Sequence, residues 1–431
     1  MAKPKLALIP AAQGSKLFSV LPSSGVGDFD FSRSGKATRI NSQGLIEEVS
    51  NGQSRLNYPM IDGKVVGCPH HILEPERRNL LPYSEDFNNS DWTKFNSTVI
   101  ANSIISPDGT LNATKLTEDT SSSTHRIYDT IIVSAAGVIC TQSIFAKSGG
   151  NGRYLRMFRG SGTYNFAVFD LDNGVVFSQG GGNIISTKIE KYPNGWYKCS
   201  STFTTQFGNI ATYYGMQNGS LDSYTGDGTS SIYLWGAMLE EGSYPTSYIP
   251  TNGESGGVTR SAETATGSGD AATFSGSECS FMFESKALLN NGSDTRISIS
   301  DGTNNNRIEF SYGSGGNEIF VLVKIGGVNI IYTTNESLSN LSEYKKFAFK
   351  LKSGNSAFYI NGFEILTSST TFSNYIMSEL KFENSADGFP FYGKAKQLQY
   401  YDSALTDSKL EQLTSWTSFT DMAEGQLYTI E

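Results

Sequence analysis

Short segments in which apolar and polar residues alternate recur along most of this chain, and they constrain the fold more than any other feature. Two clear examples have apolar residues at Ile319, Val321, Val323 and Ile325, and at Phe347, Phe349 and Leu351. A period of two sends successive side chains to opposite faces, so each segment predicts a half-buried β-strand. Asn361-Gly362 is typical of a tight hairpin turn between two such strands. The pattern therefore predicts short antiparallel strands.

Composition agrees with this pattern. The chain has 45 Gly, 22 Tyr and 26 Phe, and only 17% of its 431 residues are charged. Aromatic residues are enriched in strands and glycine in tight turns, which does not favour a helical bundle. The length predicts two or three domains, each large enough to bury a core. We therefore predict a mostly β protein, with two antiparallel β-sandwich (jelly-roll) domains after an irregular N-terminal attachment region.

Changes in the pattern divide the chain into five parts. Residues 1–78 are dense in turn signals and lack a periodic core, so we expect them to fold on a partner or on a second copy. Residues 79–250 form the first sandwich, 251–260 a Gly- and Ser-bearing linker, and 261–415 the second sandwich. A short helix, with Thr406 as its N-cap, ends the second sandwich. Residues 416–431 are a partly apolar tail that we expect to dock on a neighbouring chain.

Charge and hydropathy exclude several functional classes. The net charge of −9 disfavours a general nucleic-acid binder. No run approaches the ~18 apolar residues that a membrane helix needs, and the first residues show no cleavable signal peptide. We expect no membrane insertion, and we expect the protein to leave its cell by lysis or as part of a particle.

Cysteine and histidine are scarce and widely spaced. The four cysteines, Cys68, Cys140, Cys199 and Cys279, have no CxxC spacing and are interpreted as buried free thiols, although Cys140 and Cys199 could be close in space. Cys68-Pro69-His70-His71 lacks a second ligand cluster, so a metal site there is disfavoured. No Gly-x-Ser-x-Gly elbow is present. The sequence thus carries no catalytic signature, although carboxylate pairs are plentiful enough that residue type alone does not exclude a glycosidase.

Three parts of the sequence resemble known protein families. Residues 27–47, GDFDFSRSGKATRINSQGLIE, resemble the attachment module of bacteriophage virion proteins. Residues 79–92, NLLPYSEDFNNSDW, together with GWYK at 195–198 and IYLWGAMLE at 232–240, resemble a jelly-roll carbohydrate-binding module. FYGK at 391–394 followed by YYDSALTDSKLE at 400–411 resembles the end of a concanavalin A/laminin-G-like lectin domain.

These resemblances imply a virion structural protein, made in the host cytoplasm. It would be a tail or head fibre or adhesin, attached to other virion proteins through residues 1–78 and assembled as a homotrimer. Its sandwiches would bind glycans of the host surface or its surroundings. One alternative is a purely architectural capsid or tail decoration protein, and a third is a virion-borne polysaccharide depolymerase. We expect no enzyme activity.

Candidate carbohydrate-binding residues are the tyrosines Tyr213, Tyr214 and Tyr224, which fall near a loop rich in Gly, Asp and Ser. Their rings could stack on the apolar face of a sugar, although most loop tyrosines are simply amphipathic surface residues. Trp196 and Trp235 lie within strand patterns and are expected in the core.

Two polar clusters are further candidates. Asp301 and Asn304 occupy a hairpin tip, where they could bind sugar hydroxyls or calcium, but the turn itself favours Asp, Gly and Asn. In the jelly-roll resemblance, acids from the first and last strands often hold a structural Ca²⁺, and Glu85, Asp86 and Glu240 fall at such positions. Oxygen ligands suit that cation. The alternative is that these acids are solvated strand ends.

Overall fold

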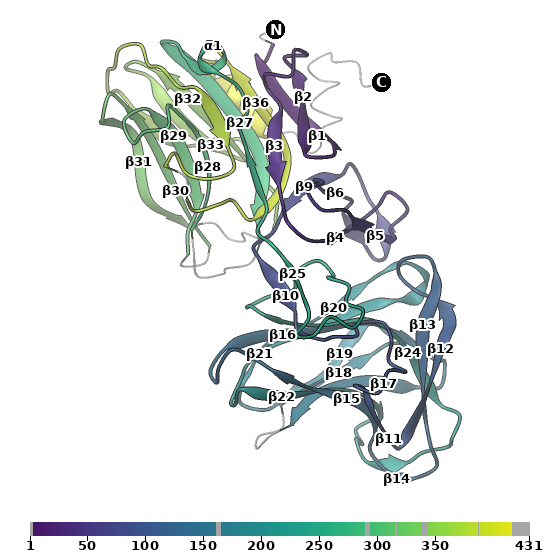
Figure 1. The fold of residues 1–431 in the computed structure, drawn as a ribbon. Helices are drawn as coiled ribbons and strands as arrows, with labels where there is room; N and C mark the ends of the chain where they lie inside the picture. The colour runs from purple at the N-terminus through teal and green to yellow at the C-terminus, as the bar shows by residue number, and fades with distance from the viewer. Residues whose placement is uncertain are drawn as a thin grey trace.

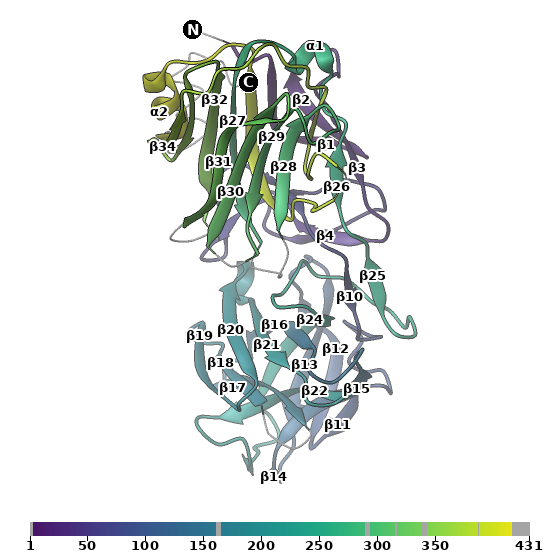
Figure 2. The ribbon, with the colours of Figure 1, turned by 90° about the vertical axis from the view of Figure 1, so that its left-hand side faces the viewer.

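The computed structural model describes residues 3–160, 165–288, 294–314, 317–337, 343–386 and 388–415. Within them the chain is mostly β-strand, and its named strand pairs are antiparallel. The predicted fold class is confirmed. Figures 1 and 2 show an elongated molecule with two sandwiches at opposite ends and a narrow waist of short strands between them.

The first sandwich consists of two six-stranded sheets that face each other. One sheet has the order β11 (Thr93–Phe95), β15 (His125–Ile132), β22 (Asn209–Asn218), β17 (Arg153–Gly160), β18 (Asn165–Asp170) and β19 (Val175–Gly180). The other has the order β12 (Ser97–Ile105), β13 (Leu111–Glu118), β24 (Ser231–Glu241), β16 (Ile139–Ser148), β21 (Tyr197–Thr204) and β20 (Ile184–Lys191). A small ribbon of β14 (Ser122–Ser123) and β23 (Tyr224–Thr225) and a 3-10 turn at η1 (Pro193–Gly195) complete it.

Period-two alternation builds the core of this sandwich. On β17, Leu155 and Met157 point inward, and on β22, Tyr214 and Met216 do so. The intervening residues of these strands therefore face away from the core. Both tryptophans expected in the core, Trp196 and Trp235, are buried in an adjoining cluster, which confirms that expectation.

The second sandwich packs a large sheet against a smaller one. The larger has the order β26 (Thr264–Thr266), β3 (Phe29–Ser32), β2 (Lys16–Leu21), β1 (Leu6–Gln13), β36 (Gly393–Tyr401), β27 (Glu278–Ala287), β32 (Lys345–Lys352), β33 (Ser356–Ile360) and β34 (Phe363–Ser368). The smaller has the order β31 (Val328–Ser337), β30 (Glu318–Ile325), β29 (Arg307–Tyr312), β28 (Thr295–Ser300) and β35 (Glu379–Lys381). The alternating runs that the sequence showed at 319–325 and 347–351 are β30 and β32.

The N-terminal strands belong to this second sandwich. Strand β1 pairs with the last strand, β36, through Leu6↔Tyr400 and Leu8↔Leu398, and Figure 1 shows β1, β2 and β3 beside β36. Their apolar side chains enter the same core as the strands of 261–415. The segment expected to be irregular is thus a set of short strands, and its folding partner is its own chain. The sequence could not show this because the partner strand lies at the far end of the chain.

Short strands form the waist. β9 (His70–Leu73) pairs with both β36 and β6 (Leu56–Asn57), and two small hairpins join β4 (Ala37–Ile40) to β5 (Ile46–Val49) and β7 (Met60–Ile61) to β8 (Lys64–Val65). β10 (Arg77–Asn79) pairs with β25 (Val258–Arg260) where the chain crosses between the sandwiches. The linker expected at 251–260 is therefore partly a strand. A Cβ added to Gly257, whose φ is +85°, would lie 1.8 Å from the backbone oxygen of Asn79, so only glycine fits this close approach.

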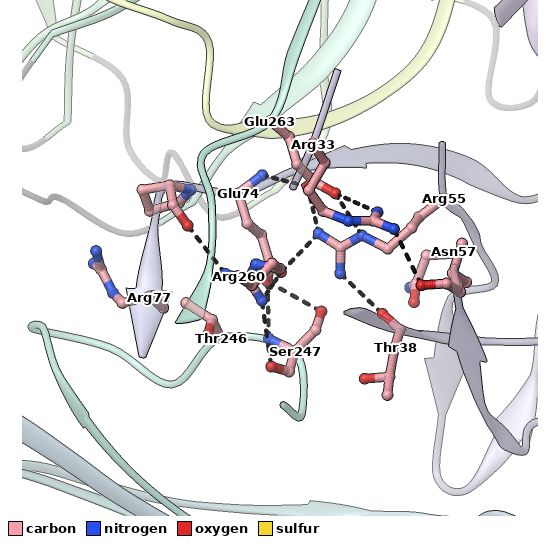
Figure 3. A network of polar contacts seen from close by, with 12 residues as sticks. Arg33, Thr38, Arg55, Asn57, Glu74, Arg77, Thr246, Ser247, Arg260 and Glu263 are labelled. Carbon is pink, nitrogen blue, oxygen red and sulfur yellow. Dashed lines mark hydrogen bonds and ion pairs between the residues drawn. The ribbon is translucent and has the colours of Figure 1, made fainter. Parts of the chain in front are cut away.

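Five buried charged residues tie the waist together, as Figure 3 shows. Glu263 accepts hydrogen bonds from Arg33 Nη1 at 3.0 Å and from Arg55 Nε at 2.8 Å. Glu74 pairs with Arg55 Nη2 at 2.8 Å and with Arg260 Nη1 at 2.8 Å. Burial alone would raise the pKa of Glu74, but the two arginines outweigh it and hold that pKa well below its usual value. The chain therefore passes between the two sandwiches through a packed polar network. Composition alone predicts a linker with few contacts.

Two short helices lie at the edges of the second sandwich: α1 (Ala271–Phe274) and α2 (Asp407–Ser415). The backbone N–H of Lys409 donates to Thr406 Oγ1 at 3.3 Å, so Thr406 is the N-cap that the sequence predicted. Leu405, Leu410 and Leu413 pack together beneath α2. The tail at 416–431 lies outside the described residues. None of the helices in the described ranges is long and apolar enough to span a membrane.

Candidate functional site

Aromatic side chains cross the outer face of the β11–β19 sheet in one row. The strand registers place Tyr128 of β15 opposite Tyr213 of β22, Tyr213 opposite Phe158 of β17, and Phe158 opposite Phe166 of β18. These residues alternate with core residues on their strands, so they share the face turned away from the sandwich interior. We name the following set the aromatic–arginine face: Phe95, Arg126, Tyr128, Arg156, Phe158, Phe166 and Tyr213.

The central rings of this row are stacked. Phe158 and Tyr213 have ring centroids 4.3 Å apart and planes within 8° of parallel. Tyr128 lies 5.0 Å from Tyr213 on the other side. Stacking of this kind fixes ring orientation and holds a continuous apolar strip on the sheet. Tyr128 and Tyr213 remain half-buried, so part of the strip meets solvent.

Two arginines lie against the row. The guanidinium carbon of Arg126 is 4.8 Å from the Phe95 ring, 5.2 Å from Phe158 and 5.0 Å from Tyr213. That of Arg156 is 4.2 Å from Phe166 and 5.6 Å from Phe158. Cation–π contact orients both guanidinium groups across the face rather than leaving them free in water.

A glycine separates the two arginines. Gly215 of β22 is opposite Arg126 on one side and Arg156 on the other. A Cβ at this position would lie 3.0 Å from the Arg126 Cβ and 2.9 Å from the His125 backbone oxygen, so any larger residue would displace β15. Because residue 215 has no side chain, it does not occupy the space between the two guanidinium groups.

The arginines differ in their polar partners. Arg156 donates to Gln217 Oε1 at 2.7 Å and pairs with Asp222 at 3.4 Å, a carboxylate that is 53% exposed. Burial lowers the pKa of Arg156. Arg126 donates from Nη1 to Thr124 Oγ1 at 2.9 Å, and its buried Nε–H has no hydrogen-bond partner among the described residues. The face thus combines apolar ring surface with oriented cationic donors.

The three predicted tyrosines do not form one site. Tyr213 lies in the aromatic–arginine face. Tyr214 points into the core, with 0% exposure, and packs 5.8 Å from Trp92. Tyr224 is buried and donates its hydroxyl to Glu118 Oε2 at 2.6 Å. Adjacent residues on a strand face opposite sides, so Tyr213 and Tyr214 could never share a surface.

The carboxylate of Glu118 explains why Tyr224 is buried. Glu118 also accepts two hydrogen bonds of 2.8 Å from Arg153 and one of 2.9 Å from the backbone N–H of Asp227. Burial would raise the pKa of Glu118, but these donors together lower it. Tyr224 therefore completes a saturated polar cluster at the end of the sheet, away from the ring row.

Asp301 and Asn304 occupy the β28–β29 turn and are engaged there. Asp301 accepts from the backbone N–H of Thr303 at 2.8 Å and from Asn306 Nδ2 at 2.8 Å. Asn304 accepts from Arg307, and Ser385 Oγ is 3.3 Å from its Oδ1. These contacts fit the turn interpretation that the sequence favoured.

The three predicted calcium ligands have separate partners. Glu240 is buried and accepts from the backbone N–H of Thr246 at 2.8 Å and from its hydroxyl at 2.7 Å. Glu85 accepts from Tyr248 at 2.8 Å and from Asn112 at 3.1 Å, whereas Asp86 is exposed and caps its own turn. Burial raises the pKa of both Glu85 and Glu240. In the part of the chain that the structure describes, no three His, Cys, Asp or Glu side chains gather as a metal site would require.

Glu85 and Asp86 instead line an acidic cavity of about 570 Å³, together with Glu48 and Glu254. Lys36, another lining residue, pairs with Glu48 at 2.9 Å. His70 and His71, the other candidate ligands, are buried in the waist. The four cysteines are free thiols, and Cys140, Cys199 and Cys279 are buried as expected. The expectation is wrong for Cys68, which is exposed because it lies in the loop between β8 and β9.

Sequence reasoning missed most of the aromatic–arginine face. A usable signal was present: Tyr154, Arg156 and Phe158 alternate with Leu155 and Met157, as Arg126 and Tyr128 do with Ile127. Large aromatic and cationic residues at the outward-facing positions of a strand indicate a functional face more directly than loop tyrosines do.

Comparison with known proteins gives distant structural neighbours only. No protein-family model matches the chain, and no curated protein is significantly similar in sequence. Solved structures that match include the CBM40 domain of the Ruminococcus gnavus IT-sialidase bound to alpha2,3 sialyllactose (16% identity, TM-score 0.27, covering 32% of this chain and 83% of that one). Another is a heptameric SAP-like pentraxin from Limulus polyphemus (13% identity, TM-score 0.27, covering 34% of this chain and 73% of that one). A third is the Trypanosoma rangeli sialidase in complex with sialic acid (8% identity, TM-score 0.29, covering 74% of this chain and 62% of that one). Similarity at this level assigns neither a family nor a ligand to the chain.

Proposed function

We propose that this protein is a non-catalytic glycan-binding protein and that its first sandwich binds saccharide on the aromatic–arginine face. The observation that carries the proposal is the half-exposed pair Tyr128 and Tyr213, whose rings lie 5.0 Å apart, with Tyr213 stacked on the buried ring of Phe158 and Arg126 oriented against it. Aromatic rings offer apolar surface to the C–H face of a pyranose. Fixed guanidinium donors select the polar groups around that ring.

The two arginines favour acidic saccharides. A guanidinium group matches a carboxylate in a bidentate geometry. Arg126 is half-buried, and it donates from Nη1 to Thr124 Oγ1. The whole chain has a net charge of −9, so a cationic pair on an exposed sheet is not a consequence of general composition. Uronic acids and other carboxylated sugars are the ligand class that this arrangement suits best.

The wider setting is also part of the proposal. The resemblance of residues 27–47 supports an adhesin of a bacteriophage particle, assembled as a homotrimer. Weak single sites then gain strength by repetition. Exposed apolar side chains of the N-terminal strands, Phe18, Val20 and Ile61, are available for contact with other virion proteins.

Binding of defined oligosaccharides to the full-length protein tests the proposal. We expect a glycan array to show stronger binding of carboxylated glycans than of their neutral counterparts. Tyr213→Ala should reduce affinity roughly tenfold, which corresponds to about 1.4 kcal/mol, because it removes a half-exposed ring on which the sugar would pack. Tyr332→Ala, which removes a 59% exposed tyrosine from the second sandwich, is the matched control and should bind as wild type. Equal glycan binding by Tyr213→Ala and wild type would show that the aromatic–arginine face is not the binding site.

An architectural role is the second candidate, and the buried network at the waist favours it, because a rigid crossing suits a spacer. Absence of glycan binding by protein that still enters particles would support that role. Release of reducing ends from a capsular polysaccharide would instead indicate a depolymerase and contradict both readings.

A further inference from the structure

A second cavity, separate from the aromatic–arginine face, lies at the waist. Its volume is about 270 Å³, and its walls come from the N-terminal segment, the first sandwich and the second sandwich. Thr38, Asn57, Thr246 and Ser247, which Figure 3 shows beside the buried ion pairs, are among its lining residues. Junctions between domains are favoured positions for small-ligand sites.

Basic residues outnumber acidic ones in the lining of this cavity. The lining includes the five basic residues Arg39, Lys188, Lys198, Lys286 and Lys394, but only two acidic ones, Glu74 and Glu190. Both acids are already paired: Glu74 with Arg55 and Arg260, and Glu190 with Lys188 at 2.7 Å. Arg39 pairs with Glu47 at 3.3 Å, so the unbalanced cations of the lining are Lys198, Lys286 and Lys394. In a chain of net charge −9, this local excess of positive charge needs a separate reason.

Two of the lysines face each other directly. Lys286 of β27 and Lys394 of β36 are register partners, so their side chains leave the sheet on the same face. Like charges at opposite positions are destabilising. The Lys286 ammonium lies 4.9 Å from the Tyr344 ring, whereas no described residue hydrogen-bonds or ion-pairs with Lys394. Burial, followed by the Lys286 charge, lowers the pKa of Lys394 to about 8.

The cavity also has unused hydrogen-bonding capacity. Tyr244 lines it, is buried, and has a hydroxyl with no hydrogen-bond partner among the described residues. Lys198 is fixed by a hydrogen bond of 2.8 Å to the Thr246 backbone oxygen, and it keeps further N–H donors. An orphan buried hydroxyl and facing ammonium groups are unfavourable unless a ligand satisfies them.

We propose that the waist cavity binds a small solute that carries an oxyanion group, with Lys286 and Lys394 as its charge partners and Tyr244 and Lys198 as further donors. Lysines suit a phosphate, sulfate or carboxylate because they act as compact point charges. The bound solute contacts both sandwiches, so it stabilises their relative position.

Calorimetric titration of the full-length chain tests this site. Sodium phosphate, sodium sulfate and sodium glucuronate are titrated at constant ionic strength, with sodium chloride and neutral glucose as blanks. We expect saturable binding of at least one oxyanion and none of the blanks. Phosphate or sulfate as the tighter ligand indicates a free inorganic anion, and glucuronate a carboxylated sugar.

Four variants separate the site from general salt effects, because sulfate and phosphate stabilise many proteins by exclusion from their surfaces. Lys286→Met and Lys394→Met should each weaken binding about tenfold or more. Lys352→Met, which removes an exposed lysine paired with Glu278, is the matched control and should bind normally. Tyr213→Ala should also bind normally, so failure of the proposed glycan site leaves this test unaffected.

Tyr244→Phe provides a further check that keeps the ring and removes only the hydroxyl, in case a lysine variant does not fold. It should weaken binding by a smaller factor than the lysine changes. No saturable binding by the wild-type chain, or equal binding by wild type and the folded lysine variants, would overturn the proposal.

Discussion

Arg55 donates a hydrogen bond from Nε to Glu263 Oε1 at 2.8 Å, although 208 positions separate the two residues in the chain. Neither side chain has any exposed surface. Arg55 belongs to the N-terminal segment and Glu263 to the start of the second sandwich, so the contact joins parts of the chain that the sequence presents as separate. Removing one partner of such a pair leaves an uncompensated buried charge.

Glu263→Gln should therefore destabilise the folded chain strongly. The change leaves Arg33 and Arg55 without their shared carboxylate, and the expected loss is ~3–5 kcal/mol in the free energy of unfolding. Urea denaturation of the full-length protein measures it. Glu48→Gln is the matched control, because the Lys36–Glu48 pair is 65% and 46% exposed and such pairs contribute at most ~1 kcal/mol. A loss below that level for Glu263→Gln would show that the network contributes little to stability.

Leu8→Ala should weaken the second sandwich although it lies in the N-terminal segment. Leu8 is buried in the same core as Leu398, its register partner on β36. Removing a buried leucine side chain costs ~2–5 kcal/mol. The control is Val20→Ala on β2, where the side chain is 50% exposed and the change should cost below ~1 kcal/mol. Hydrogen exchange of β36 reports the effect; unaltered protection of β36 in Leu8→Ala would argue that the two segments fold independently.

The strands of both sandwiches could be predicted because period-two alternation is a local property of the sequence. Their partners could not. The sequence of β1 specifies which of its faces is apolar, but not that its neighbour is β36, since register and pairing depend on the rest of the chain. The same limit explains the linker at 251–260, whose Gly and Ser content suggested few contacts, while Arg260 within it is completely buried.

The candidate site was predictable only in part. The sequence indicates Tyr213 only together with Tyr214 and Tyr224, because all three fall near the same loop. Within β22 the alternation that sends Tyr214 into the core sends Tyr213 outward. Phe158 and the two arginines join Tyr213 through strand pairing across the sheet, which a single sequence does not show.

Tyr224→Phe should affect stability and leave glycan binding unchanged. The substitution keeps the ring, which packs 4.9 Å from His125, and removes the hydroxyl that donates to the buried Glu118 carboxylate. Hydrogen bonds to charged groups contribute ~1.5–3 kcal/mol, so thermal unfolding should detect the change. Tyr213→Ala is expected to reduce glycan affinity, and it also costs about 1–2 kcal/mol of stability because it removes the ring that packs on Phe158 and Tyr128. Loss of glycan affinity in Tyr224→Phe would mean that the site extends to the end of the sheet.

Acid should destabilise the protein through His71. Burial lowers the pKa of this histidine to about 3, whereas the unfolded chain has its ordinary value of 6.5. Between those values the unfolded state binds a proton that the native state does not, so stability is present above pH 6.5 and is lost as the pH falls toward 3. At ~1.4 kcal/mol per pKa unit, the loss from this residue is at most about 5 kcal/mol.

His71→Leu should flatten that dependence. Both ring nitrogens of His71 are buried without hydrogen-bond partners among the described residues, so an apolar side chain leaves no described group newly unpaired. Ile72→Leu, on the same strand β9, is the control for disturbance of packing and should keep the wild-type slope. Urea denaturation at intervals from pH 7 to pH 4 gives the three slopes. A slope for His71→Leu equal to that of the wild type would place the acid sensitivity elsewhere, with His70, whose pKa burial and nearby lysines also lower, as the next residue to replace.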